Sequence, residues 1–207
     1  WLETGAVAPS DIAACTAHAA SATAVRAELG IACGTEAAPV VAAAGIVLLG
    51  CKPQQLDTIL PELAASARPG QVWVSILAGI ATGRLEAGLP AGAAVVRCMP
   101  NTPVRLGLGV VAVAPGRHVA PPALAQVMAL LDPLGQTLAV PEDGMDAFTA
   151  VAGCGPAYVF LFLEALAQAA VAVGIPAASA SDLARQVASG ALALAAADGR
   201  SLAELRV

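Results

Sequence analysis

Three short apolar runs, each followed by turn-forming residues, constrain the fold of this chain most strongly. They are IVLLGC (46–51), VWVSI (72–76) and AVVRCM (94–99). Apolar runs of this length without polar alternation are typical of strands buried on both faces, as in parallel sheets. Helical stretches separate the runs. The sequence therefore predicts an α/β domain with a mostly parallel sheet and helices on both faces.

The order of the remaining elements divides the chain into two domains. We expect further strands at 12–15, 109–114 and 138–140, and helices at 19–29, 53–67, 82–89 and 121–131. Beyond Pro141 only helices are predicted, at 143–151, 156–173 and 181–197. A boundary at Pro141–Glu142 is therefore expected, between an α/β domain (1–141) and an all-α domain (142–207).

Composition excludes some classes of partner. The net charge is −5 and no basic run occurs, so no nucleic acid is expected to bind. The longest uncharged stretches are 147–163 and 165–181, separated only by Glu164. Both are short for a membrane span, and neither has a basic flank or an aromatic belt. We therefore expect a helical core shared between subunits, with Glu164 on its surface or as a polar anchor inside the interface, and no membrane.

The cysteines and histidines do not predict a metal site. No two cysteines have metal-binding spacing, and the two histidines are far apart (Cys15, Cys33, Cys51, Cys98, Cys154; His18, His118). Scattered cysteines without a signal peptide indicate the reducing cytoplasm. Cys154 has no His or acid near it in the sequence, so nucleophilic catalysis by this thiol is not expected.

Turn-forming residues follow each of the three apolar runs. Lys52-Pro53 follows the first, Ala78-Gly79 the second and Asn101-Thr102 the third. Singly, these residues are typical of caps and turns. Ligands of open parallel sheets, however, bind beyond the carboxyl ends of the strands. The occurrence of such turn-forming residues at three successive strand ends therefore indicates one shared binding crevice.

The end of the 12–15 strand bears on the choice of cofactor. A dinucleotide site that prefers NAD usually has an acid there, which binds the ribose hydroxyls. Here the strand runs into Thr16 and His18, and the next acid is Glu28. The pattern favours NADP, with Thr16 facing the 2′-phosphate. The short glycine pair Gly153 and Gly155 follows a helix and precedes a proline, so it is not a phosphate loop. We therefore expect a strand and a Gly-rich turn before Trp1.

Four motifs in order resemble the pyrroline-5-carboxylate reductase family. They are GCKP (50–53), SILAG (75–79), RCMPNTP (97–103) and GCGPAYVF (153–160), and the match extends through 164–176 and 202–206. The family reduces 1-pyrroline-5-carboxylate to L-proline with NAD(P)H, the last step of proline biosynthesis. The resemblance implies a Rossmann-like domain, a helical dimerisation domain, and homodimers that can form decamers.

The resemblance also implies roles for particular residues. Glu142 would lie near the substrate, and Thr16 would face the adenosine 2′-phosphate; the cofactor would be NADPH or NADH. The remaining cofactor-binding residues would be Gly50, Cys51, Lys52, Pro53, Ile76, Leu77, Ala78, Asn101 and Thr102, the last two beside the nicotinamide. No catalytic residue or metal is implied, because hydride transfer to a protonated imine needs alignment of two rings and charge stabilisation.

The sequence departs from the family pattern in three places. The family's Gly-rich loop is expected before Trp1 and its Ser-Pro-Gly-Gly-Thr-Thr loop after Val207, so the chain is expected to be a fragment. Cys154 stands where the family usually has serine. Two alternatives stay open: an inactive, truncated oligomerisation scaffold, and another NADP-dependent two-domain reductase such as a β-hydroxyacid dehydrogenase. The second would need a lysine in the helical domain, and no lysine follows Lys52.

Overall fold

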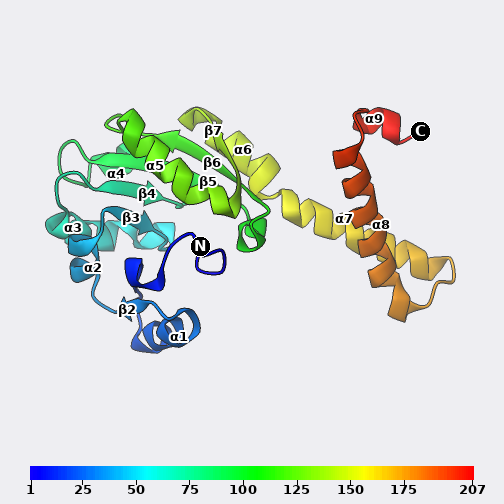
Figure 1. Cartoon of the computed structure of the whole chain (residues 1–207), viewed down its shortest axis with the longest axis horizontal. Helices are drawn as coiled ribbons and strands as arrows, with labels where there is room; N and C mark the ends of the chain where they lie inside the picture. Colours follow the sequence, from blue (N-terminus) through cyan, green and yellow to red (C-terminus); the bar gives the residue numbers. More distant parts are fainter. The chain divides into compact units, whose positions relative to one another are not determined.

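The computed structural model describes all of residues 1–207, which form two compact units (Figure 1). Unit 1 comprises Trp1–Gly153 and unit 2 comprises Cys154–Val207. Every strand belongs to unit 1, and unit 2 is helical. This order agrees with the predicted sequence of an α/β part followed by an all-α part.

A five-stranded sheet forms the centre of unit 1. Its strands are ordered β3-β4-β5-β6-β7, and every pair is parallel except β5 and β6. The mostly parallel sheet is therefore confirmed. The three apolar runs form strands, as predicted, and β7 begins earlier than expected. The strand bounds are β3 Ile46–Leu49, β4 Val72–Ser75, β5 Ala94–Pro100, β6 Gly109–Pro115 and β7 Gly135–Ala139.

A second, two-stranded sheet precedes the central one in the chain. β1 (Ala13–Cys15) pairs in parallel with β2 (Ala32–Gly34), and α1 (Ala19–Leu29) connects them. α1 has the predicted bounds and ends where Gly30 adopts a left-handed conformation. β2 and the following α2 (Ala37–Ala43) are absent from the predicted elements. β2 has three residues, ends in a glycine and lacks the β-branched side chains that indicate a strand.

Helices cover both faces of the central sheet. α2, α3 (Leu56–Ser66) and α4 (Thr82–Glu86) pack on one face, around the buried Trp73 and Val95. α5 (Pro121–Leu131), which crosses the sheet in Figure 1, packs on the other face against Val96. Neighbouring residues of β5 thus enter different cores, because successive side chains of a strand point to opposite faces.

The segment 142–153 packs on the central sheet as part of unit 1. It contains a 3₁₀ turn (Glu142–Gly144), α6 (Met145–Phe148) and a π-helical turn (Thr149–Gly153). Met145 is fully buried against Met99, Ala112 and Ala114. Because of this packing, the division between the units falls after Gly153, further along the chain than the expected boundary at Pro141–Glu142.

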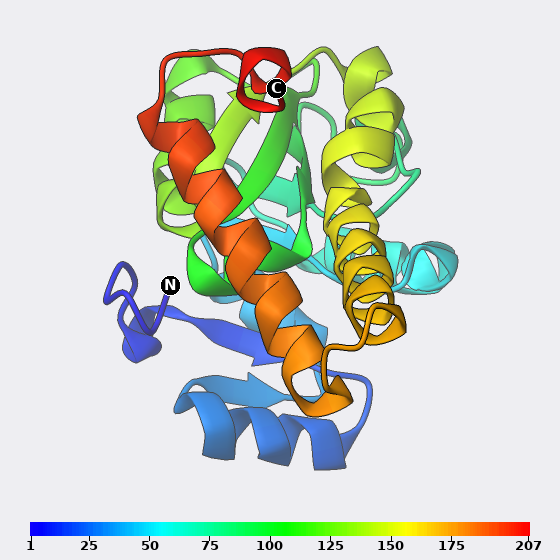
Figure 2. The same ribbon diagram turned by 90° about the vertical axis from the view of Figure 1, so that its right-hand side faces the viewer.

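Unit 2 is a helical hairpin with a short third helix. α7 (Gly155–Ala172) packs beside α8 (Ala177–Ala197), and α9 (Leu202–Leu205) follows (Figure 2). Only small side chains are buried in this unit, and four successive apolar residues of α7 are exposed (buried Ala170, Ala180, Ala184; exposed Val159, Phe160, Leu161, Phe162). A hairpin with so little core and so much exposed apolar surface is typical of a binding interface. By length and composition alone, the helical stretch Glu142–Ala172 is also apolar enough to cross a membrane.

Candidate functional site

The carboxyl ends of β3, β4 and β5 lie at the same edge of the central sheet. The three strands are parallel, and Leu49, Ser75 and Arg97 lie opposite one another in register. Three segments leave this edge, and together they hold nine of the predicted site residues: Gly50–Pro53, Ile76–Ala78, and Asn101 with Thr102. The structure therefore brings these nine residues to the place where ligands of parallel sheets bind.

The first segment, Gly50–Pro53, leads directly into a 3₁₀ turn. The Lys52 amide donates to Gln55 Oε1 (3.1 Å), and the Gln55 amide donates to the Lys52 carbonyl (2.9 Å). Pro53 occupies the first position of the turn, where no amide hydrogen is needed. A Cβ on Gly50 would lie 3.8 Å from Ile76 Cδ1, so the first and second segments are in contact.

The second segment is anchored at its start by the sheet. The Ile76 amide donates to the Leu49 carbonyl (3.2 Å), and the Leu77 amide donates to Ser75 Oγ (3.3 Å). Leu77 is buried in the core, so only its backbone can face a ligand. Ala78 and Gly79 are exposed, and Gly79 has a φ of 73°. The exposed backbone of this loop is suited to close approach by a ligand.

Asn101 ties the end of β5 to two other segments of unit 1. Its Oδ1 accepts a hydrogen bond from the Val110 amide (2.9 Å), and its Nδ2 donates to the Ala152 carbonyl (3.0 Å). The carboxamide is therefore fixed in orientation by β6 and by the π-helical turn. Thr102, which begins the next 3₁₀ turn, is exposed beside it. The sequence did not predict the bracing of Asn101, because Ala152 is 51 residues away.

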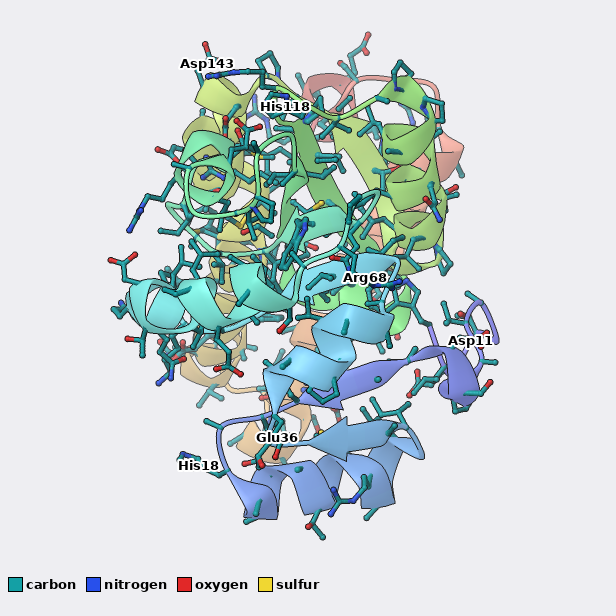
Figure 3. The ribbon with its side chains drawn as sticks, turned by 90° about the vertical axis from the view of Figure 1, so that its left-hand side faces the viewer. Asp11, His18, Glu36, Arg68, His118 and Asp143 are labelled. Carbon is teal, nitrogen blue, oxygen red and sulfur yellow. The ribbon has the colours of Figure 1, made fainter.

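Thr16 directly follows β1 of the two-stranded sheet and is therefore not among the residues at the ends of β3, β4 and β5. Its amide donates to the Gly34 carbonyl (3.0 Å), and its hydroxyl donates to the His18 carbonyl (3.1 Å). Figure 3 shows His18 and Glu36 at the same end of the β1–β2 pair. Glu36 is the N-cap of α2, an element that the sequence did not predict. An acid is thus present near this end, although none follows β1 directly.

Glu142 contacts the beginning of α4 with both carboxylate oxygens. Oε1 accepts from the Thr82 amide (2.6 Å) and Oε2 accepts from the Thr82 hydroxyl (2.7 Å). Arg97 Nη1 lies 3.8 Å from Oε1, and Arg97 Nη2 lies 3.4 Å from Asp146 Oδ1. Neither Arg97 nor Thr82 is among the site residues that the sequence predicts. The sequence does contain a signal for Arg97: a lone charge within an otherwise apolar strand indicates an ion pair, since such a charge needs a partner.

The remaining titratable side chains of unit 1 do not form a metal centre. No group of three or more His, Cys, Asp or Glu side chains has the geometry to hold an ion. Burial raises the pKa of Cys98 to about 12, so this residue is a neutral thiol at physiological pH. Burial also raises the pKa of the half-buried Cys51 above its ordinary value.

Comparison with known proteins first defines the class. The family model described as "NADP oxidoreductase coenzyme F420-dependent" matches residues 1–79, and that described as "Pyrroline-5-carboxylate reductase dimerisation" matches residues 142–207. Together with the mostly parallel sheet, these matches show similarity to the class of NADP-type oxidoreductases in the first part of the chain and to a dimerisation region in the last part. The start of the second match coincides with the boundary expected from the sequence, whereas the compact units divide after Gly153.

Individual relatives then define the family. A pyrroline-5-carboxylate reductase of Mycobacterium tuberculosis is 43% identical over 166 residues (77% of this chain, 56% of the relative). One of Methanosarcina acetivorans is 33% identical over 205 residues (99% and 76%). The solved pyrroline-5-carboxylate reductase of Coxiella burnetii matches with a TM-score of 0.90 and 26% identity (99% and 76%).

The chain belongs to the pyrroline-5-carboxylate reductase family, as its motifs predicted. It spans about half the length of several curated relatives that it matches. The Plasmodium falciparum pyrroline carboxylate reductase, solved with NADP bound, is also similar in structure (TM-score 0.79, 25% identity, 86% of this chain and 68% of that one).

Proposed function

We propose that the protein containing this chain reduces 1-pyrroline-5-carboxylate to L-proline with NADPH or NADH. One observation carries the proposal: the family's three strand-end motifs lie together at one edge of a mostly parallel sheet, where dinucleotides bind. Membership of the family supports the choice of substrate. The reaction class is oxidoreduction at a CH–NH bond, and the expected cellular compartment is the cytoplasm.

The proposed cofactor contacts follow the sheet edge. Backbone groups of Gly50–Pro53 and Ile76–Ala78 would hold the dinucleotide, with Thr16 towards the adenosine 2′-phosphate. Asn101 and Thr102 would form the wall beside the nicotinamide, and Glu142 would lie near the substrate. The NADP-bound Plasmodium relative supports a nicotinamide cofactor. A lower KM for NADPH than for NADH would support the role of Thr16.

In the proposed reaction, the protein's main role is to align the nicotinamide ring with the ring of the imine substrate. When bound, the reduced dinucleotide supplies the hydride that the imine carbon accepts. The imine nitrogen must already carry its proton, so that the hydride produces a neutral secondary amine. A carboxamide fixed by two hydrogen bonds, as in Asn101, provides a rigid wall against which the reacting rings can stack.

We further propose that unit 2 joins two copies of the chain. The exposed apolar residues of α7 and the match of residues 142–207 to a dimerisation family support a homodimer, which could assemble further into decamers. A protein that dimerises but binds no dinucleotide would instead be an oligomerisation scaffold.

The proposed activity is tested by mixing the purified whole protein with NADPH and pyrroline-5-carboxylate. We expect NADPH absorbance to fall only when both are present, with equimolar formation of proline. Folded protein that binds NADPH without turning over this substrate would contradict the proposed reaction. Absence of NADPH binding would favour the scaffold.

Alkylation of Cys51 tests where the dinucleotide lies. Because burial raises its pKa, the Cys51 thiolate is scarce at neutral pH, and its reaction with iodoacetamide should accelerate about tenfold per pH unit until the pH reaches that pKa. We expect saturating NADPH to slow alkylation of Cys51 and to leave the exposed Cys154 of unit 2 unaffected. Equal rates at Cys51 with and without NADPH would place the dinucleotide elsewhere.

A further inference from the structure

The Glu142 carboxylate completes the start of a helix from a distant part of the chain. α4 has five residues and begins at Thr82, and its N-cap residue, Ala81, offers no side-chain acceptor. Glu142, 60 residues further on, accepts from both the amide and the hydroxyl of Thr82. It therefore satisfies one of the backbone donors that the first turn of a helix leaves without a partner inside the helix.

Arg97 forms an ion pair with this carboxylate, with Nη1 lying 3.8 Å from Oε1. Its strand neighbours in register are Ser75 and Ala114, whose small side chains leave room for the guanidinium on that face of the sheet. Arg97 is only 5% exposed, and its Nε has no hydrogen-bond partner. A buried cation needs a nearby anion. Of the two carboxylates beside it, Asp146 is 89% exposed and screened by solvent, whereas the Glu142 side chain is 31% exposed.

The bond between Glu142 and Thr82 anchors one end of the loop that follows β4. This loop (76–81) is held at its start by hydrogen bonds of Ile76 and Leu77 to the sheet. Its middle, Ala78 and Gly79, is exposed. At its end, the amide of Thr82 has the Glu142 carboxylate as its partner. Loss of that acceptor would release the end of the loop and leave its start in place.

We propose that Glu142 is a positioning residue for the dinucleotide loop 76–81, acting through Thr82 and held by Arg97. The proposal rests on the proposed function only in assigning this loop to the dinucleotide. It deepens that function, because it makes cofactor affinity depend on a residue of the segment that leads into the helical unit. Glu142 then influences the reaction without touching the cofactor.

The central test is the substitution Glu142→Gln. The amide can accept from Thr82 through one atom only, and it removes the negative charge beside Arg97. We expect the KM and Kd for NADPH to rise at least about tenfold while kcat changes less than about twofold. Asp146→Asn is the matched control, because it neutralises the other carboxylate on Arg97 without contact to the loop, and it should leave the KM for NADPH within about twofold.

Variants of Thr82 test the same connection from its other side. Thr82→Ser keeps both hydrogen bonds and should retain the wild-type KM for NADPH. Thr82→Val keeps the amide bond, loses the hydroxyl bond, and should show part of the increase seen with Glu142→Gln. In a variant that combines Thr82→Val with Glu142→Gln, the two effects on the KM for NADPH should be less than additive, since both substitutions remove the same hydroxyl–carboxylate bond.

Amide hydrogen exchange separates this proposal from the proposed function. We expect Glu142→Gln to speed exchange at residues 78–82, whether or not the protein turns over pyrroline-5-carboxylate. Altered exchange and NADPH affinity without turnover would leave the positioning role intact and contradict the proposed reaction. A lower melting temperature with unchanged exchange and NADPH Kd would overturn the positioning role. So would an increase confined to the KM for pyrroline-5-carboxylate, which would make Glu142 a direct substrate ligand.

Discussion

Gly135→Ala is expected to reduce the free energy of unfolding of unit 1 by at least about 3 kcal/mol. Gly135 begins β7 with φ 130° and ψ −144°, a conformation that is essentially restricted to glycine. A Cβ there would lie 2.1 Å from the Gly109 carbonyl oxygen and 2.6 Å from its nitrogen. Both atoms belong to the backbone, so no flexible side chain can move aside.

The substitution should also affect the candidate site. Gly109 packs against the backbone of Val104, in the 3₁₀ turn that Thr102 begins, so a displacement of Gly109 is transmitted to that turn. We therefore expect the KM for NADPH to rise in any folded fraction. Denaturant unfolding gives the stability change, with Gly144→Ala as the control: Gly144 has φ −81° and open space around it, so a change within about 1 kcal/mol is expected. Wild-type stability of Gly135→Ala would contradict the packing of β6 against β7.

Phe162→Asp is expected to weaken self-association of the protein at least about 100-fold. Phe162 is 58% exposed on α7, among apolar residues that have no other covering within unit 2. If two copies bury this surface, the substitution removes an aromatic contact and places a carboxylate in an apolar interface, where the combined cost is about 3 kcal/mol or more.

Analytical ultracentrifugation over a range of concentrations would measure the effect. Leu29→Asp is the control, because Leu29 is an exposed apolar residue of α1 in unit 1 and should leave the dissociation constant unchanged. Circular dichroism would verify that the helices of unit 2 remain folded. An unchanged association constant for Phe162→Asp would place the interface on another surface.

Local patterns predicted most of the fold. The buried strands were recognisable because their apolar runs stop at Gly, Pro and Asn residues, and α1 and α5 have the predicted bounds. β2 was not recognisable, because three residues ending in Gly34 carry no strand pattern. The compact units divide after Gly153 because Met145 is buried against the sheet, a contact with β5 and β6 that periodicity within 142–153 does not reveal.

The candidate site was predictable only in part for the same reason. Residues at the ends of β3, β4 and β5 follow from strand order, so sequence alone could group them. The bonds of Asn101 to Ala152 and of Glu142 to Thr82 join residues 51 and 60 positions apart. Such contacts depend on the register of the whole sheet. The lone charge of Arg97 in the apolar strand β5 indicates a buried ion pair. Its partners, Glu142 and Asp146, can be identified only from the packing of the segment 142–146 beside it.

Isotope transfer tests the proposed reaction most directly. The whole protein is incubated with pyrroline-5-carboxylate and NADPH that carries deuterium at the transferred position of the nicotinamide C4, and the product is analysed by mass spectrometry. We predict L-proline with one deuterium on the former imine carbon, in an amount equal to the NADPH oxidised. Absence of proline, or proline without deuterium from a folded protein that binds NADPH, would contradict hydride transfer at this site.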